Sequence, residues 1–152
     1  MENNRLLSAS CVVIHEGCVL LVKHTYGAVK GKYLIPGGFS ELLEMPQRTA
    51  EREVLEETNV TVNAEKLVAV RFTEKEVWCI FSAAYVSGTP ASDGCENDEA
   101  IFMPVEEALA SELVVETTKV IIRAVQRADK SGLAKSTFVN GRFTKDNWQL
   151  FI

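Results

Sequence analysis

The amino-acid sequence predicts an α/β fold, and more specifically an α/β/α sandwich around a mixed β-sheet. Strand-like segments stand both before and after a helical segment at 46–58, and a second helical segment follows at 116–130. A sheet covered by helices on both faces is one of the few layered arrangements that bury such a set of elements. The chain has 152 residues, so we expect a single domain over 1–152 with a sizeable core.

The first two predicted strands form a hairpin. Segments 6–15 (LLSASCVVIH) and 18–24 (CVLLVKH) are apolar and rich in β-branched residues, and only Glu16-Gly17 separates them. The run 19–22 is apolar at every position, which predicts a strand covered on both faces. The glycine-containing segment 25–32 is predicted to be a loop.

More strands are predicted after the central helix. Segment 60–73 contains strand pieces around a polar interruption at 63–66, and the charged residues 74–76 are expected to turn the chain. Segment 76–87 (EVWCIFSAAYVS) is the strongest strand pattern, with apolar residues at both alternating sets of positions. We therefore expect both of its faces to be buried.

The last third of the chain begins with a polar loop at 87–98, a short strand at 99–103, and a helix opened by Pro104. The amphipathic helix at 116–130 is expected to end near Gly132. Segment 137–152 contains a predicted hairpin turn at Asn140-Gly141 and ends in WQLFI. These terminal apolar residues must be buried, either in their own domain or against a partner subunit.

Composition excludes several classes of function. The hydrophobic fraction is 47%, the charged fraction is 24% and the net charge is −5, so we expect no binding to a nucleic-acid polymer. No apolar run is long enough to span a membrane, and the amino terminus does not resemble a signal peptide, so we expect a cytoplasmic protein. The four cysteines lack a C-x-x-C spacing and are interpreted as free thiols, mostly buried.

The helix at 46–58 has an acidic edge. At 100° per residue from Ala50, the carboxylates of Glu56, Glu53 and Glu57 fall at roughly 240°, 300° and 340°. The neighbouring arc is predicted to be buried and consists of Ala50, Val54, Leu55 and Thr58. Repulsion between like charges four residues apart costs a few tenths of a kcal/mol, which a bound cation would remove.

The segment before this helix supplies matching chemistry. Pro36-Gly37-Gly38 can turn tightly and leave a backbone carbonyl open to a ligand. Oxygen donors of this kind favour Mg²⁺ or Mn²⁺ over zinc.

The spacing from Gly38 through Glu44 to Arg52 and the segment 52–60 (REVLEETNV) resembles the Nudix box, the signature of the Nudix hydrolases. One position departs from the family pattern, because Asn59 stands where the family has Gly. That residue would end the helix in the left-handed conformation, which Asn tolerates better than most residues.

This resemblance implies the Nudix fold and the hydrolysis of a nucleoside diphosphate linked to a further group. Carried over position by position, it implies that Mg²⁺ is held by Glu53, Glu56 and Glu57 together with a carbonyl from Gly37 or Gly38. Arg52 would orient a carboxylate, and Glu44 would support the site or complete it. The general base is left open among Glu53, Glu96 and Glu99, since family members often carry acidic residues before the strand that ends near Phe102.

The resemblance also suggests substrate-binding residues. Lys23 stands where Nudix proteins often place a basic residue facing phosphate, although it can equally be an exposed lysine at a strand end. Gly38 is expected to lie against the substrate. Phe72 and Trp78 are candidates for stacking on a nucleobase, with core packing as the alternative for both. Tyr33 is expected to pack beneath the glycine loop.

The expected partner is a small-molecule nucleotide, and the protein is expected to be a monomer or a homodimer. Nucleoside triphosphates and ADP-ribose-like sugar nucleotides are favoured over dinucleoside polyphosphates for a chain of this length. Two other classes of function stay open: a nucleotide sensor that binds without cleaving, and an interaction domain that uses the acidic helix and the apolar tail.

Overall fold

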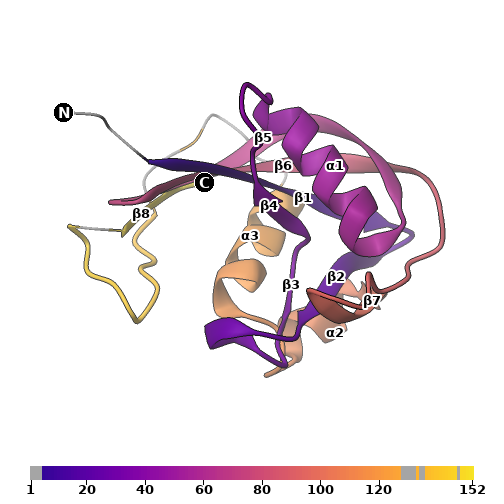
Figure 1. Ribbon diagram of the computed structural model, residues 1–152. Helices are drawn as coiled ribbons and strands as arrows, with labels where there is room; N and C mark the ends of the chain where they lie inside the picture. Colours follow the sequence, from indigo (N-terminus) through magenta and orange to yellow (C-terminus); the bar gives the residue numbers. More distant parts are fainter. Residues whose placement is uncertain (1–4, 128–132, 134–135, 147) are drawn as a thin grey trace.

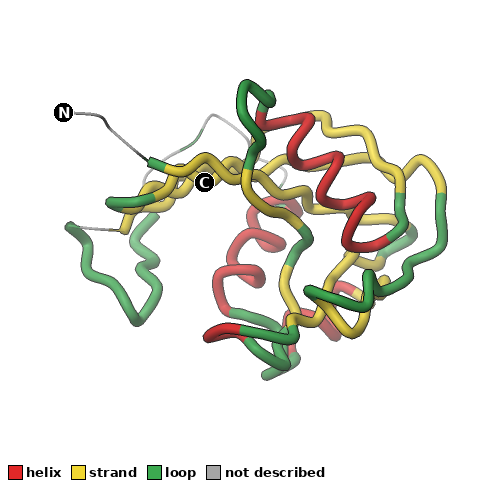
Figure 2. Tube along the Cα trace, viewed as in Figure 1, coloured by secondary structure: helices red, strands yellow, loops and turns green. Residues whose placement is uncertain are grey.

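The computed structural model describes residues 5–127, 133, 136–146 and 148–152, and these form a mixed α/β fold as predicted (Figures 1 and 2). In chain order the elements are β1 (Leu6–His15), β2 (Cys18–His24), the 3₁₀ helix η1 (Gly27–Val29), β3 (Tyr33–Leu34), β4 (Gly37–Phe39), α1 (Pro46–Thr58), β5 (Thr61–Thr73), β6 (Glu76–Ser87), β7 (Asn97–Pro104), α2 (Val105–Ala110), α3 (Glu116–Gln126) and β8 (Trp148–Phe151).

The strands form a mixed sheet in the order β3-β2-β1-β6-β5-β8, with β4 beside β1 and β7 beside β2. The neighbours β1 and β6 run parallel, whereas β1 pairs antiparallel with both β2 and β4. Strand β1 therefore has β6 along one edge, while β4 and β2 share the other edge. This arrangement places the short glycine strand β4 next to the centre of the sheet.

Helices α1 and α3 cover opposite faces of the sheet (Figure 1). On one face, Ala50 and Val54 of α1 pack in an apolar cluster with Ala9 of β1. On the other face, Ile121 of α3 packs in a second cluster with Val12 of β1. Side chains three residues apart on a strand point to opposite faces, so β1 contributes to both layers of the core.

The amino-terminal hairpin is confirmed. Glu16 and Gly17 connect β1 and β2, and both have positive φ, at 49° and 76°. That backbone matches the right-handed twist of a two-residue hairpin and suits a glycine at the second position. All four residues from Val19 to Val22 are fully buried, because β2 is covered on both faces.

Predictions for three segments were wrong. Segment 61–73 is one continuous strand, and its polar interruption is absorbed by register shifts against β6 at Ala64/Lys66 and Leu67/Ala69. Helix α3 ends at Gln126, because Arg127 already has extended backbone; Gly132 lies outside the described residues. Asn140 accepts a turn hydrogen bond from the Phe143 N–H at 2.9 Å, but the described part of 137–152 contains only β8, so this turn does not join two strands.

The apolar end of the chain is buried in its own domain. Strand β8 pairs antiparallel with β5, and Trp148 and Leu150 lie in the core cluster on the α3 side. The exposed fraction of the Trp148 side chain is 2%, and that of Leu150 is zero. Of the two locations left open by the sequence, the tail occupies the one within the same chain.

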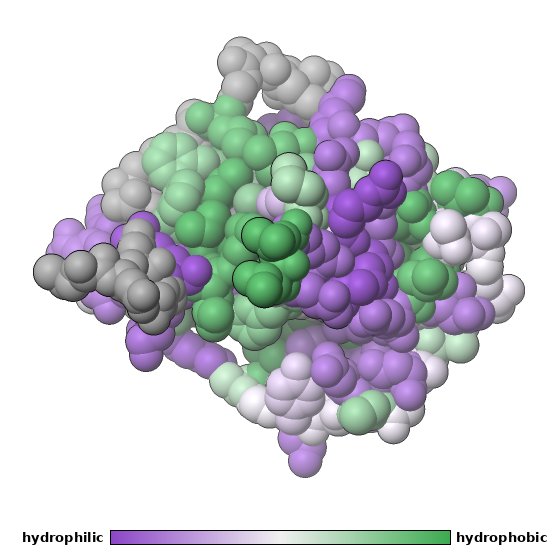
Figure 3. Space-filling model, turned by 45° about the horizontal axis from the view of Figure 1, so that its top comes forward, coloured by the Kyte–Doolittle hydropathy of each residue, from purple (hydrophilic) through white to green (hydrophobic). Residues whose placement is uncertain are grey.

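Some apolar side chains remain at the surface, where hydrophobic and hydrophilic areas lie side by side (Figure 3). The loop between β4 and α1 exposes Leu42 and Leu43 by 93% and 92%, so neither contributes to the core. Leu55 of α1, predicted to be buried, is 48% exposed because it lies at the margin of the helix face that meets the sheet. Within the described residues, we find no helix with the length and apolar character needed to cross a membrane.

Candidate active site

Helix α1 has the predicted start and end. Pro46 occupies its first turn, where its missing N–H costs nothing. Asn59 ends the helix in the left-handed conformation at φ 60°, and its N–H donates to the Leu55 carbonyl at 2.9 Å. The asparagine therefore supplies the conformation for which glycine is usually used.

The two glycines of β4 allow a close approach between this strand, β1 and α1. Gly37 and Gly38 pair with Ser10 and Ala9 of β1. A Cβ atom on Gly37 would lie 2.5 Å from the Ala9 carbonyl oxygen, and one on Gly38 would lie 2.5 Å from the carboxyl carbon of Glu53. The space that side chains would fill at 37 and 38 is thus occupied by β1 and by a carboxylate of α1.

Glu57 is the most buried carboxylate of the acidic edge, with 3% of its surface exposed. The backbone N–H of Gly37 donates to its Oε2 at 2.9 Å. Burial raises the pKa of Glu57 to about 8, and the nearby charges of Glu53, Glu96 and Asp93 act in the same direction. A cation near this carboxylate would stabilise its ionised form.

Glu53 lies beside the glycines and next to Arg52. Burial raises the pKa of its carboxyl group, and the guanidinium of Arg52 opposes that shift. Arg52 Nη1 donates to Glu53 Oε1 at 2.8 Å. Glu53 is therefore a carboxylate held in place by one cation, with its ionised form disfavoured by partial desolvation.

Arg52 connects the helix to the preceding loop. Its Nε and Nη2 donate to the two oxygens of Glu44 at 2.9 and 3.0 Å, Nη1 also donates to Glu56 at 3.0 Å, and Nη2 reaches the Phe39 carbonyl at 3.1 Å. These bonds, with a contribution from the Glu41 N–H and the Thr49 hydroxyl, hold the pKa of Glu44 at about 2. Arg52 thus donates hydrogen bonds to three carboxylates, those of Glu44, Glu53 and Glu56.

Of the residues expected to bind metal, Glu53 and Glu57 meet at the glycine strand, whereas Glu56 is 58% exposed and points to Arg52. No three histidine, cysteine or acidic side chains of the described residues already form a group that could hold an ion. The donors are nevertheless all oxygens, and Glu57 is a carboxylate whose pKa is raised mainly by burial. Divalent-ion binding fits this donor set.

Glu96 and Glu99, the other candidates for general base, have different surroundings. Glu96 lines the same cavity as Glu53, whereas Glu99 does not border it. Glu99 accepts a hydrogen bond from the hydroxyl of Tyr33, and it is the strand partner of Lys23. The Lys23 ammonium lies 5.7 Å from the centre of the Tyr33 ring. Tyr33 itself is buried, as expected.

A cavity of about 470 Å³ opens beside the glycine strand and the half-buried carboxylate of Glu53. It is lined by Ser8, Ser10, Tyr26, Leu34, Ile35, Gly37, Gly38, Phe39, Glu53, Arg71, Glu76, Trp78 and Glu96. Trp78 lines this cavity and also packs against the core cluster on the α3 side. Phe72 does not line it; this side chain is 37% exposed and packs edge-on against Phe151.

Sequence reasoning did not identify Arg71 and Glu76 as site residues, although both line the cavity. The available signal was weak, since each is one charged residue near the end of a strand pattern. Their meeting depends on the pairing of β5 with β6, which brings Arg71 opposite Trp78.

The fold and this site define the class of protein: an α/β/α fold in which an acidic helix lies against a glycine strand, beside a cavity. A family model described as NUDIX domain matches residues 4–125, which is most of the chain. The chain belongs to the Nudix hydrolase family.

Solved structures with the same fold include a MutT NUDIX hydrolase from Burkholderia pseudomallei, with 20% identity and a TM-score of 0.70 over 80% of this chain and 98% of that one. A NUDIX hydrolase from Nitrosomonas europaea has 22% identity and a TM-score of 0.70 over 80% and 88% of the two chains. An ADP-ribose pyrophosphatase from Streptococcus suis has 15% identity and a TM-score of 0.64 over 82% and 94%. At these identities the likeness is one of fold. No curated protein matches the sequence significantly.

Proposed function

We propose that this protein hydrolyses a phosphoanhydride bond in a nucleoside diphosphate linked to another group, with Mg²⁺ as cofactor and Mn²⁺ as a substitute. The observation that carries the proposal is the meeting of Glu53 and Glu57 with Gly37 and Gly38, beside a cavity that Glu53 and both glycines line. Glutamates on a helical edge facing backbone oxygens provide the hard donors that a divalent ion prefers.

Glu53, Glu56 and Glu57 would hold the ion together with a carbonyl oxygen of Gly37 or Gly38. When bound, a divalent ion neutralises phosphate charge and lowers the pKa of bound water. Without it, a substrate with several negative charges would face the acidic edge of α1, in a protein whose net charge is −5. The need for Mg²⁺ follows from this electrostatic mismatch.

The residues around the carboxylates have positioning roles in the proposal. Arg52 fixes Glu53 through Nη1 and is itself fixed by both oxygens of Glu44. Glu53 and Glu96 both border the cavity and are the better placed candidates for general base, because Glu99 is engaged by Tyr33. A general base must come within hydrogen-bonding distance of the attacking water.

The substrate class proposed is a nucleoside triphosphate or an ADP-ribose-like sugar nucleotide. Among fold relatives, one is named an ADP-ribose pyrophosphatase and another a UDP-X diphosphatase, so the fold accommodates substrates of this kind. Lys23 would meet phosphate from the end of β2. The protein would act in the cytoplasm as a monomer or a homodimer on small nucleotides.

The test is a screen of nucleoside triphosphates, sugar nucleotides and dinucleoside polyphosphates with and without Mg²⁺, with product identification by mass spectrometry. The proposal expects a nucleoside monophosphate product from at least one compound, formed only with the divalent ion. Nucleotide binding without turnover across the whole screen would instead identify a non-catalytic sensor. Failure to bind any of the compounds would favour an interaction domain.

A further inference from the structure

A row of side chains extends the cavity away from the carboxylates, on the α3 side of the sheet. Four adjacent strands contribute one residue each at matching register: Phe39 of β4 pairs with Ser8 of β1, Ser8 with Trp78 of β6, and Trp78 with Arg71 of β5. Residues paired across strands share a face of the sheet, so these side chains form one continuous surface. All four border the cavity that also contains Glu53.

Hydrogen bonds and stacking hold this surface in one arrangement. The indole N–H of Trp78 donates to the Ser10 hydroxyl at 2.9 Å. The guanidinium carbon of Arg71 lies 4.7 Å from the centre of the Trp78 ring, within the range of a cation–π contact. Phe39 is 56% exposed at the opposite end of the row.

Glu76 lies beside this row, and hydrogen bonds orient both of its carboxylate oxygens. The Ser8 hydroxyl donates to Oε1 at 2.5 Å, and Arg71 Nη2 donates to Oε2. Each carboxylate oxygen can accept two hydrogen bonds, so both keep accepting capacity.

Arg71 and Glu76 form a one-armed ion pair and not the bidentate pair that arginine and carboxylate frequently make. Arg71 reaches Glu76 through Nη2 only, and its Nε is buried without a hydrogen-bond partner among the described residues. Burial lowers the pKa of Arg71, in keeping with a guanidinium largely removed from water. Keeping a half-satisfied charge pair at a cavity wall is costly, which suggests a use in ligand recognition.

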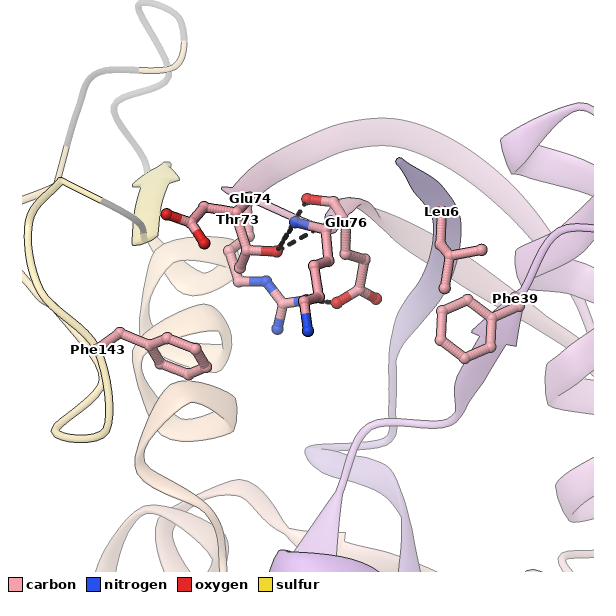
Figure 4. A pocket seen from close by; sticks show the side chains of 8 residues that line it. Leu6, Phe39, Thr73, Glu74, Glu76 and Phe143 are labelled. Carbon is pink, nitrogen blue, oxygen red and sulfur yellow. Dashed lines mark hydrogen bonds and ion pairs between the residues drawn. The ribbon is translucent and has the colours of Figure 1, made fainter. Parts of the chain in front are cut away.

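The Arg71–Glu76 ion pair borders two cavities. A second cavity of about 490 Å³ shares Phe39, Arg71 and Glu76 with the first and is otherwise lined by Leu6, Thr73, Glu74, Lys75 and Phe143. Figure 4 shows Phe39 and Phe143 on opposite sides of this space, with Glu76 between them. Glu76 is therefore accessible to a ligand from this space as well.

We propose that Glu76 and Arg71 form hydrogen bonds with the edge of the substrate's base and select guanine. This inference rests on the proposed function and names the base that the same site accepts. Guanine carries two adjacent N–H donors, at N1 and the 2-amino group, next to the O6 acceptor. The donors match the two oriented oxygens of Glu76, and O6 matches the guanidinium of Arg71. Adenine turns the N1 acceptor toward the carboxylate, and uracil offers one donor between two acceptors.

The experiment is calorimetric titration of the full chain, at saturating Mg²⁺, with GMP, IMP, UMP and AMP. These compounds have no anhydride bond, so binding is measured independently of turnover. We expect GMP to bind at least about tenfold more tightly than IMP, which lacks the 2-amino donor, and more tightly still than UMP or AMP. The comparison uses the unaltered protein and does not depend on the folding of a variant.

Two variants test whether Glu76 causes the preference for GMP. Glu76→Gln replaces one accepting oxygen by a donor and should reduce the preference for GMP over AMP at least about tenfold, whereas Glu65→Gln, an equal charge change at an exposed residue that lines neither cavity, should leave it unaltered. Equal binding of the four compounds, binding by none, or a GMP preference that survives in Glu76→Gln would overturn base selection by Glu76. If the protein prefers GMP but hydrolyses no anhydride, the proposed activity is refuted, whereas the selection of guanine by Glu76 and Arg71 is still supported.

Discussion

The backbone N–H of Gly37 donates a 2.9 Å hydrogen bond to Oε2 of Glu57, joining the glycine strand to the acidic helix across twenty residues of sequence. Glu57 has only 3% of its surface exposed, so this bond is a main source of compensation for removing the carboxylate from water. The same bond fixes the direction of the carboxylate relative to Glu53. The catalytic capacity of the site should therefore depend on the charge of Glu57 more than on its shape.

Glu53→Gln and Glu57→Gln should each lower turnover about a hundredfold at saturating Mg²⁺, within the range of about 10²–10⁴ for loss of a general base. Glutamine keeps the side-chain size, and its carbonyl oxygen can still accept from the Gly37 N–H, so the fold should persist. Steady-state hydrolysis of the best substrate from the screen measures the change in kcat.

Glu65→Gln, at an exposed position of β5, is the matched control and should retain the full rate. Rates close to those of the unaltered protein in both Glu53→Gln and Glu57→Gln would refute the assignment of these carboxylates.

The stability of the metal-free protein should fall as pH rises from about 5 to 8. The pKa of Glu57 is about 8 in the folded state against 4.5 for an unperturbed glutamate, so the folded protein binds more protons than the unfolded chain in this window. Linkage then makes the Glu57 contribution greatest below the unfolded pKa and removes it as pH passes the folded value, with a slope of at most about 1.4 kcal/mol per pH unit.

Thermal unfolding in the presence of a chelator measures this slope as a Tm decrease of at most about 4 °C per pH unit. Glu57→Gln should show a flatter profile, and saturating Mg²⁺ should raise Tm most at the alkaline end, where the carboxylate is ionised. Parallel Tm profiles for the two proteins would show that Glu57 titrates in its ordinary range.

Local sequence signals predicted the acidic helix and its surroundings well. The helix from Pro46 to Thr58 and its left-handed end at Asn59 agree with the prediction, because proline, helical periodicity and a residue that tolerates positive φ act within a few positions. The wheel also placed Arg52 near Glu56, and they form an ion pair at 3.0 Å.

Contacts set by long-range pairing could not be predicted in the same way. Arg71 of β5 lies opposite Trp78 of β6 only because of the register shifts earlier in the pairing of these two strands. The bidentate bond between Arg52 and Glu44 depends on the path of the loop after β4, and the engagement of Glu99 by Tyr33 depends on β2 and its neighbours. Such contacts depend on tertiary packing, on which periodicity and propensity carry no information.

Alanine substitutions at the two adjacent glycines should separate activity from stability. In Gly38→Ala the new Cβ meets the movable end of Glu53, so we expect a turnover loss of about tenfold or more with a small change in Tm. In Gly37→Ala the Cβ meets the Ala9 carbonyl at 2.5 Å, which should destabilise the fold by about 1–3 kcal/mol. Denaturant titration and kinetics on both variants test this; equal losses of stability would contradict it.

Arg52→Lys should lower both turnover and stability, because lysine keeps the charge but cannot form the fork to Glu44 while also reaching Glu53. We expect a stability loss of about 2 kcal/mol, the scale of hydrogen bonds to charged groups. Arg48→Lys is the control, since the Arg48 side chain is 78% exposed and makes one ion pair with Glu51. Such exposed pairs contribute about 0–1 kcal/mol, so unfolding of Arg48→Lys should match that of the unaltered protein.

Leu150→Ala should destabilise the protein by about 2–5 kcal/mol, because Leu150 is fully buried in the core cluster on the α3 side and alanine would leave a cavity. Leu43→Ala deletes the same atoms from a side chain that is 92% exposed and should change the unfolding free energy by less than about 0.5 kcal/mol.

Because the tail packs within its own chain, the loss in Leu150→Ala should be the same at every protein concentration. If the tail instead helped to cover a partner subunit, the Tm difference between the two variants would grow on dilution. Thermal unfolding across a hundredfold range of concentration distinguishes the two.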